Sequence, residues 1–429
     1  MVRSVRARAE PVVSVAARWL AAARLVAAHR DLLDARPGMP ELSDALAARG
    51  WASFLVGLDD EELAALEIGG HAATWPPRTP PGLSALVAAA RDVCALPMLI
   101  EPARCLAGVA VSPVPSQRRR ETPRKRAQID AFARIILPLA KDAARVIDVG
   151  SGHGHLTRAI AERIDRPVIG LDRDDGLALR ARSLPSTASP SFAVVDVLRD
   201  GLGLTASDCV IGLHACGELG DVMVESAARS GGALALIGCC LQKRRASSRA
   251  PLAPLAPLSD GAALASLTSA ALDLPRHVLG LSNLTARDEG VEATRAENLA
   301  GRERRLALHR LLEAAGVTLP LGAEIGGLNR RAAHGDLASL VARAFAVRRR
   351  SPPSASAIAE AASWARVEHA EMRRLSLPRA LLARVLEVLV LADRARHLEA
   401  HRRDVTIGLI FPESVSPRNL ALVSPATSS

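Results

Sequence analysis

Short apolar runs alternate with longer stretches of helical periodicity through the middle of the 429-residue chain. Buried apolar strands that alternate with helices are typical of a parallel sheet covered on both faces. The pattern therefore predicts an α/β fold. The five runs that predict strands are Val146–Val149, Arg166–Asp172, Ser191–Asp196, Cys209–His214 and Ala233–Cys239.

Helical periodicity dominates on both sides of this region. Before it, apolar spacing predicts helices over Val13–Leu33, Leu42–Leu58, Glu61–Leu66 and Leu83–Leu96. After it, the spacing predicts helices over Ala262–Ala271, Glu292–Ala315, Asp336–Val347, Ala357–Ala365 and Leu377–Arg402. The repeated Pro-Leu-Ala-Pro in Ala246–Ser259 predicts a flexible loop.

Two last apolar runs, Val405–Phe411 and Asn419–Val423, are joined through Pro412–Arg418. They predict an antiparallel hairpin that completes a seven-stranded sheet. We divide the chain accordingly into a helical N-terminal region (1–118), a sheet-forming core (119–240), a mainly helical insertion (241–380) and a C-terminal helix with the hairpin (381–429).

The first predicted strand leads into the turn Gly150-Ser-Gly-His-Gly154, and a helix over Leu156–Ile164 follows. A glycine-rich turn after a strand brings backbone N–H groups and a helix N-terminus against a ligand. Glycine permits the close approach and the positive φ angles of such a turn. Ligands of parallel sheets bind beyond the carboxyl ends of the strands, and here these ends carry Asp172, Asp196 and His214. The alternative for either acid is that it caps the helix that follows.

The order of a glycine turn, an acid after the second strand and an acid after the third resembles the class I S-adenosylmethionine-dependent methyltransferases. The resemblance implies a Rossmann-like sheet and S-adenosylmethionine as the cofactor, with residues 119–240 as the cofactor-binding core. It implies that Asp172 holds the ribose and that Asp196 and Val197 meet the adenine. The other implied cofactor contacts are Gly150, Gly152 and Gly154 at the methionine part, Asp148 behind them, and His214.

Gly212-Leu-His-Ala-Cys-Gly-Glu-Leu219 and Gly238-Cys-Cys240 look like the methyltransferase-like twenty-five family, which includes proteins named for a ribosomal RNA adenine dimethylase-like domain. Asp393–Ala400 and Ser416-Pro-Arg-Asn-Leu-Ala-Leu-Val423 are similar to the same family. So is Thr122–Arg126, where the family usually has Ser-Pro-Lys-Lys followed by His-Glu. Ala127 and Gln128 replace that last pair here, so its role is not carried over.

The chain has 55 Lys and Arg against 45 Asp and Glu. A basic balance favours a polyanionic partner, but the arginine-rich, tyrosine-free composition is also typical of GC-rich genomes. Aromatic residues are too few for base-stacking platforms. Two basic clusters, Arg118–Arg126 and Lys243–Arg245, flank the predicted cleft and would contact phosphates without reading a sequence. RNA is therefore the first candidate substrate, and a solvated linker is the alternative for the first cluster.

Methyl transfer from a sulfonium requires alignment of the nucleophile and exclusion of water. A hydroxyl target would also need a base, for which His214 is the candidate; a capping role is its alternative. Cys216 is the second candidate catalytic residue, although the usual Pro-Cys setting of covalent methylation is absent. Cys216, Cys239 and Cys240 could bind zinc with His214, but adjacent side chains diverge from an extended backbone. We therefore expect apolar packing and no metal.

The six cysteines show no disulfide framework, and no apolar run reaches membrane-spanning length. The longest, Leu382–Leu391, is interrupted by Arg384 and Glu387. The sequence predicts a cytoplasmic methyltransferase. A protein substrate and a non-catalytic scaffold that binds the cofactor remain alternatives, and the oligomeric state is left open.

Overall fold

The computed structural model describes residues 13–100, 121–254, 267–268, 270–286 and 294–427. The chain divides into two compact units. The first comprises Met1–Arg30, Ala88–Asn283 and Leu382–Ser429, and the second comprises Asp31–Val87 and Leu284–Leu381. Segments 1–118 and 241–380 of the sequence each contribute to both units.

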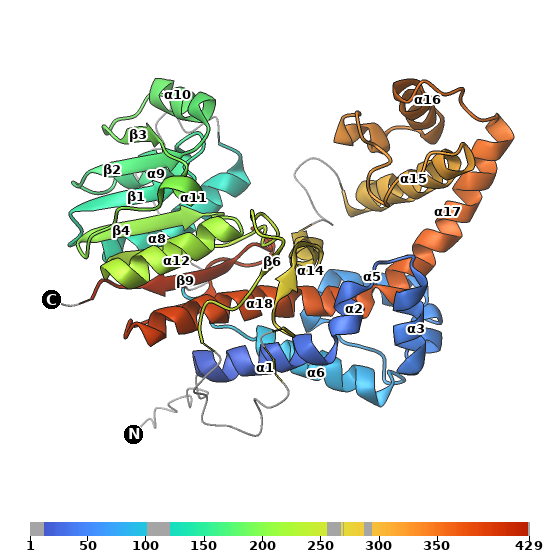
Figure 1. Ribbon diagram of the computed structural model, residues 1–429, viewed down its shortest axis with the longest axis horizontal. Coiled ribbons are helices and arrows are strands. Elements are labelled where there is room, and N and C mark those ends of the chain that lie inside the picture. The colour runs from blue at the N-terminus through green and yellow to red at the C-terminus, as the bar shows by residue number, and fades with distance from the viewer. Residues whose placement is uncertain (1–12, 101–120, 255–266, 269, 287–293, 428–429) are drawn as a thin grey trace, which may run out of the picture. The chain divides into compact units, whose positions relative to one another are not determined.

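The first unit is built on a seven-stranded sheet with the order β3-β2-β1-β4-β5-β9-β8 (Figure 1). Neighbours among β1 to β5 are parallel, whereas β9 is antiparallel to both β5 and β8. The predicted sheet and its antiparallel last hairpin are confirmed. The strands are β1 (Arg145–Val149), β2 (Val168–Asp172), β3 (Ser191–Val194), β4 (Asp208–Leu213), β5 (Ala233–Ile237), β8 (Thr406–Leu409) and β9 (Leu420–Ser424).

Helices pack on both faces of this sheet. Cys209 and Ile211 of β4 share a buried core with α8 (Pro123–Ala140) and α9 (His155–Ala161). Gly212 points to the other face, where a Cβ atom would lie 2.8 Å from Met223 Cε of α12 (Glu218–Ser230). Because successive side chains of a strand alternate between faces, a continuous apolar run is what both layers require. Two shorter helices, α10 (Asp175–Ser183) and α11 (Val197–Asp200), follow β2 and β3.

The start of α8 is set by its sequence. Thr122 Oγ1 accepts a hydrogen bond from the backbone N–H of Lys125, and Pro123 occupies the first helical turn. A threonine cap followed by proline is a strong helix start. Lys125 is thereby placed in the first turn of α8.

The first unit also contains several helices outside the sheet layers. They are α1 (Val15–Ala28), the end of α6 (Pro81–Cys94), α14 (Arg276–Leu279), the 3-10 helix η3 (Gly280–Ala286) as far as Asn283, and α18 (Leu377–Ala400) from Leu382 onward. The backbones of Pro97 and Leu99 exchange hydrogen bonds of 2.8 and 2.7 Å with Leu409. This pairing covers the outer edge of β8 and removes an open strand edge.

The loop predicted over Ala246–Ser259 is wrong in part. Ser248–Arg249 forms β6, which pairs antiparallel with Leu274–Pro275, β7. The buried ion pairs of Arg249 hold this segment in place. The helix predicted over Ala262–Ala271 lies largely outside the described residues, and its end at Ala270 and Ala271 is a turn.

The second unit is helical. Its first half contains α2 (Arg30–Asp34), α3 (Pro40–Ala48), α4 (Ala52–Val56), α5 (Asp60–Gly69) and η1 (Gly70–Ala72). Its second half contains α15 (Arg295–Ala314), η4 (Arg330–His334), α16 (Leu337–Val347) and α17 (Ala355–Leu375), and α15 to α17 share an apolar core around Leu312 and Phe345. Glu67 of α5 pairs with Arg295 of α15 and with Arg373 of α17. Among the described helices, none has both the length and the apolar character that a membrane span requires.

Candidate active site

The glycine turn after β1 adopts the backbone that its sequence predicts. Gly150, Gly152 and Gly154 have φ angles of 74°, 55° and 70°, in the region that favours glycine. A Cβ atom on Gly152 would meet no atom within 4 Å, and one on Gly150 would meet only Leu219 Cδ2 at 3.6 Å. The bare backbone of Gly150 and Gly152 therefore faces open space, as the approach of a ligand requires.

Gly154 has a different surrounding. A Cβ atom there would lie 2.4 Å from Phe192 Cε1 of β3, and one on Gly170 of β2 would lie 2.7 Å from Phe192 Cδ1. These two glycines make room for an aromatic ring of the chain itself. The packing explains why position 154 is glycine without any ligand, and its cofactor contact stays a prediction.

Asp148 lies behind the turn. Its side chain is buried, and Thr157 Oγ1 of α9 donates a 2.7 Å hydrogen bond to Asp148 Oδ2. Burial raises the pKa of Asp148 to about 6, against the opposing effects of Thr157 and the Lys125 ammonium. The residue joins the end of β1 to the first turns of α9 and so fixes the helix relative to the turn.

Asp172 ends β2, next to the glycine turn. Its Oδ2 accepts a 2.8 Å hydrogen bond from the Gly152 N–H, and its Oδ1 accepts one of 3.0 Å from Asp174. Asp174 caps α10 through the N–H of Leu177, so the capping alternative does not apply to Asp172. Each carboxylate oxygen can accept a second bond, which leaves room for two ribose hydroxyls.

Asp196 does cap a helix. Its Oδ1 accepts from the N–H of Leu198 at 3.2 Å, at the start of α11, and its Oδ2 pairs with Arg245 at 2.9 Å. Val197 beside it is buried. The adenine contact of Asp196 and Val197 stays a prediction, and Arg245 would have to share the carboxylate with an adenine amino group.

His214 follows β4, and its backbone has a φ angle of 69°, which residues other than glycine rarely adopt. Its backbone N–H donates a 2.9 Å hydrogen bond to Ile237 O of β5, and its ring Nε2 lies 3.4 Å from Gln128 Oε1. Burial lowers the pKa of His214 to about 4, and the charges of Lys125 and Arg418 act in the same direction. The imidazole is therefore neutral at pH 7 and is a weak base.

Gln128 stands where the family that the sequence motifs resemble usually has glutamate, and its Oε1 lies 3.4 Å from His214 Nε2. We expect Gln128→Glu to raise the pKa of His214 by about one unit or more, because a carboxylate favours the charged imidazole. Titration of the histidine ring signals by NMR measures this shift. Ala127→Glu, which adds the same charge one residue earlier, is the control; an unchanged His214 pKa in Gln128→Glu would contradict the contact.

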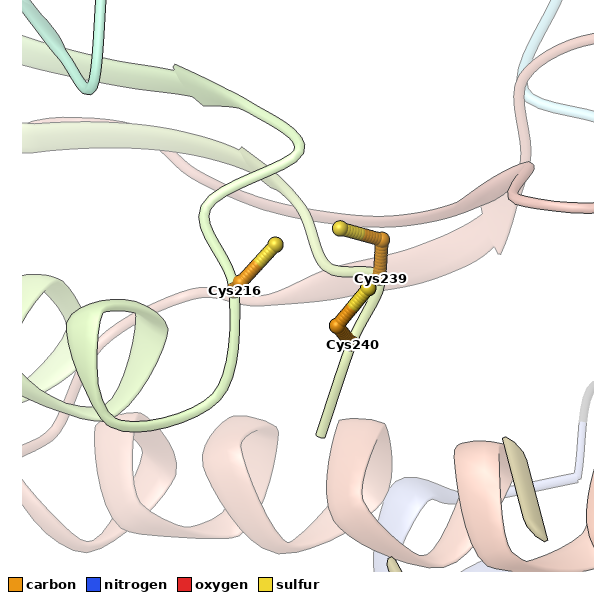
Figure 2. Close-up of side chains that lie close together, drawn as sticks. All are labelled: Cys216, Cys239 and Cys240. Carbon is orange, nitrogen blue, oxygen red and sulfur yellow. The ribbon is translucent and has the colours of Figure 1, made fainter. Parts of the chain in front are cut away.

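Three cysteines meet beside His214. The sulfur atoms of Cys216, Cys239 and Cys240 all lie within 4.8 Å of one another (Figure 2). Since β5 ends at Ile237, Cys239 and Cys240 do not belong to an extended strand, and the expectation that their side chains diverge is wrong. The ring of His214 is not part of this group. Its carbonyl is close instead, and it accepts from Cys216 Sγ at 3.0 Å and from Cys239 Sγ at 3.5 Å.

The thiol of Cys240 is the acidic one of the three. Contacts with Cys216 and Cys239 lower the pKa of Cys240 below its usual range, and the charges of Lys243 and Arg418 lower it further. The three sulfur atoms thus meet beyond the carboxyl end of β5, where the resemblance implied only a motif.

Several cations of the two basic clusters already contact other groups of the chain. In the second, Arg244 pairs with Asp221 at 3.2 Å and Arg245 pairs with Asp196. In the first, residues 118–120 lie outside the described part of the chain, and Arg124 contacts Ser416 Oγ at 3.2 Å. Lys125 is close enough for its charge to act on Asp148 and on His214.

Asp221 of α12 is the centre of a buried ion network. It pairs with Arg249 at 3.1 Å, with Arg394 at 2.9 Å and with Arg244. Asp393 joins the network because it also pairs with Arg249, at 2.8 Å, and it accepts a hydrogen bond from the N–H of Leu252. The sequence motif that begins at Asp393 is thereby explained as structural support beneath the turn after β4, because Arg394 also donates to Gly217 O.

A second buried network involves the other C-terminal motif. Glu387 of α18 pairs with Arg418 and, at 2.7 Å, with Arg384, and Arg384 donates to Asn419 Oδ1 at 2.6 Å. Arg418 also donates to Cys239 O at 3.4 Å. Arg384 and Glu387, the charged residues inside the apolar run Leu382–Leu391, are the only indication of this network in the sequence, which does not reveal their partners.

A family model described as a methyltransferase domain matches residues 124–247, under a third of the chain. The match spans the glycine turn, both acids and the three cysteines. No curated protein and no solved structure gives a significant match. The fold and the match define a methyltransferase domain, and a domain of this class uses S-adenosylmethionine as its methyl donor. The residues fit that cofactor, since the backbone at Gly152 is open and Asp172 has lone pairs to spare.

Proposed function

We propose that the protein is an S-adenosylmethionine-dependent methyltransferase that acts on RNA in the cytoplasm, as a relative of the methyltransferase-like twenty-five family. The observation that carries the choice of substrate is the position of Lys125. Its ammonium acts on Asp148 of β1 and on His214 after β4, so it lies at the carboxyl edge of the sheet. A cation at that edge suits a phosphate group next to the methylated nucleotide.

The bound cofactor supplies an activated methyl group. The residues of the chain hold and orient it: Gly150 and Gly152 offer bare backbone, and Asp172 accepts from the ribose. A neutral His214 with a pKa of about 4 is poorly suited to deprotonate a hydroxyl. A base nitrogen carries its own lone pair and needs alignment more than a base. We therefore propose a nitrogen atom of a nucleobase as the acceptor.

Incubation of the protein with cofactor labelled at the methyl group, together with fractionated RNA and protein, tests this function. We expect label in RNase-sensitive material, and we expect Lys125→Ala to reduce its transfer about tenfold or more, as the loss of one charge-assisted bond implies. Lys141→Ala, at the other end of α8, is the matched control. Label in protease-sensitive material would overturn the RNA substrate, and cofactor binding without any transfer would support a scaffold instead. Cell fractionation tests the location.

A further inference from the structure

The group formed by Cys216, Cys239 and Cys240 is built from two turns of the sheet. Cys216 lies in the turn after β4, and the other two lie after the neighbouring strand β5 (Figure 2). Parallel pairing of β4 with β5 brings the two turns to the same edge. No other group of three or more metal-binding side chains is found among the described residues.

The spacing of the sulfur atoms is close to that of a metal site. Tetrahedral zinc with Zn–S bonds of about 2.3 Å separates its sulfur ligands by about 3.8 Å. The three sulfur atoms lie within 4.8 Å of one another, so a contraction of roughly 1 Å, within the reach of side-chain rotation, would suffice. Thiolates are soft ligands that suit zinc.

We propose that Cys216, Cys239 and Cys240 bind one Zn²⁺ ion as thiolates, with the fourth tetrahedral position taken by an exchangeable ligand. Three thiolates and one Zn²⁺ leave one excess negative charge. Lys243 and Arg418 supply positive charge at this place, since both act on Cys240. Arg418 is itself fixed by Glu387 and by its bond to Cys239 O, so the compensation is preorganised.

Zinc would join the turns after β4 and β5 and so order one side of the cleft. Binding releases thiol protons. The His214 carbonyl then loses the S–H donors of Cys216 and Cys239. The metal is therefore expected to alter the environment of His214, whose backbone is held at a positive φ angle.

The full-length protein, purified without a tag under reducing conditions, tests the site. Elemental analysis should find one equivalent of zinc per chain, and Co²⁺ added to the chelator-treated protein should give strong sulfur-to-cobalt charge-transfer absorption. Cys216→Ser and Cys240→Ser should each lower zinc affinity at least about tenfold. Cys209→Ala, which changes a core cysteine of β4 outside the group, should retain full binding.

Three results would overturn the proposal: free thiols that take up no zinc, a disulfide within the group in the freshly reduced protein, or copper in place of zinc. Thermal unfolding of each variant checks that loss of metal is not loss of fold. Calorimetry with S-adenosylmethionine on the same samples measures cofactor binding separately from the metal content. Failure of the zinc site therefore leaves the proposed methyltransferase function intact, and failure of cofactor binding leaves the zinc site intact.

Discussion

Replacement of Asp172 by alanine should weaken S-adenosylmethionine binding about 100-fold or more. The carboxylate has two functions at once. It holds the glycine turn through the Gly152 N–H at 2.8 Å, and it offers its remaining lone pairs to the ribose. A hydrogen bond to a charged group contributes roughly 1.5–3 kcal/mol. The loss of two hydrogen bonds from the ribose hydroxyls therefore corresponds to at least about 3 kcal/mol of binding free energy, or about 100-fold in Kd.

Isothermal calorimetry with S-adenosylmethionine and with its demethylated product measures this loss. Asp174→Ala is the matched control, because it removes a carboxylate two residues away that caps α10. That change should cost about 1 kcal/mol of stability with little change in Kd. Tight binding by Asp172→Ala would refute the ribose contact, and equal losses in both variants would point to a general disturbance of the loop.

The sheet could be predicted because its strands are short and continuously apolar. Residues such as Cys209 and Val210 face opposite helical layers, and both are fully buried. Such a run has few alternatives when glycine or an acid follows it. The glycine turn and Asp172 could be predicted for the same reason, since their order along the chain fixes their neighbours in space once the strands are parallel.

The rest depends on contacts between residues far apart in sequence. Phe192 fills the space over Gly154 and Gly170, and no spacing rule indicates that pairing. Arg249 looked like part of a flexible loop because its partners, Asp221 and Asp393, are distant along the chain. Tertiary contacts of this kind override local composition.

The cysteines show how a small error in a strand boundary changes a chemical conclusion. The apolar run predicts an extended strand through Cys239, whereas β5 ends at Ile237. Beyond the strand, the chain turns, and the side chains of Cys239 and Cys240 can converge on Cys216. Strand ends are the least certain part of a sequence-based assignment, and this site lies at one.

Asp221→Asn should lower the free energy of unfolding by about 3–5 kcal/mol, which is the cost of breaking a buried ion pair by removing one partner. The side chain of Asp221 is buried, as are Arg249 and Arg394. Arg394 would lose the carboxylate with which it pairs, and Arg249 would keep only Asp393. Urea unfolding followed by circular dichroism measures the loss. Asp200→Asn is the control, because its pair with Arg199 is exposed to solvent and its loss should change the stability little.

The pH dependence of the free energy of unfolding, compared between the wild type and Asp221→Asn, gives a second test. Burial alone would raise the pKa of Asp221, but the charges of Arg249 and Arg394 lower it well below its usual value. A carboxylate with a lowered folded pKa stabilises the protein fully above its unfolded pKa of about 3.9, and this contribution is lost as the pH falls through the folded pKa. The stability difference between wild type and Asp221→Asn should therefore be constant near neutral pH and narrow in acid. Asparagine occupies nearly the same volume without the charge, so a difference that does not narrow would contradict an electrostatic origin of the lost stability.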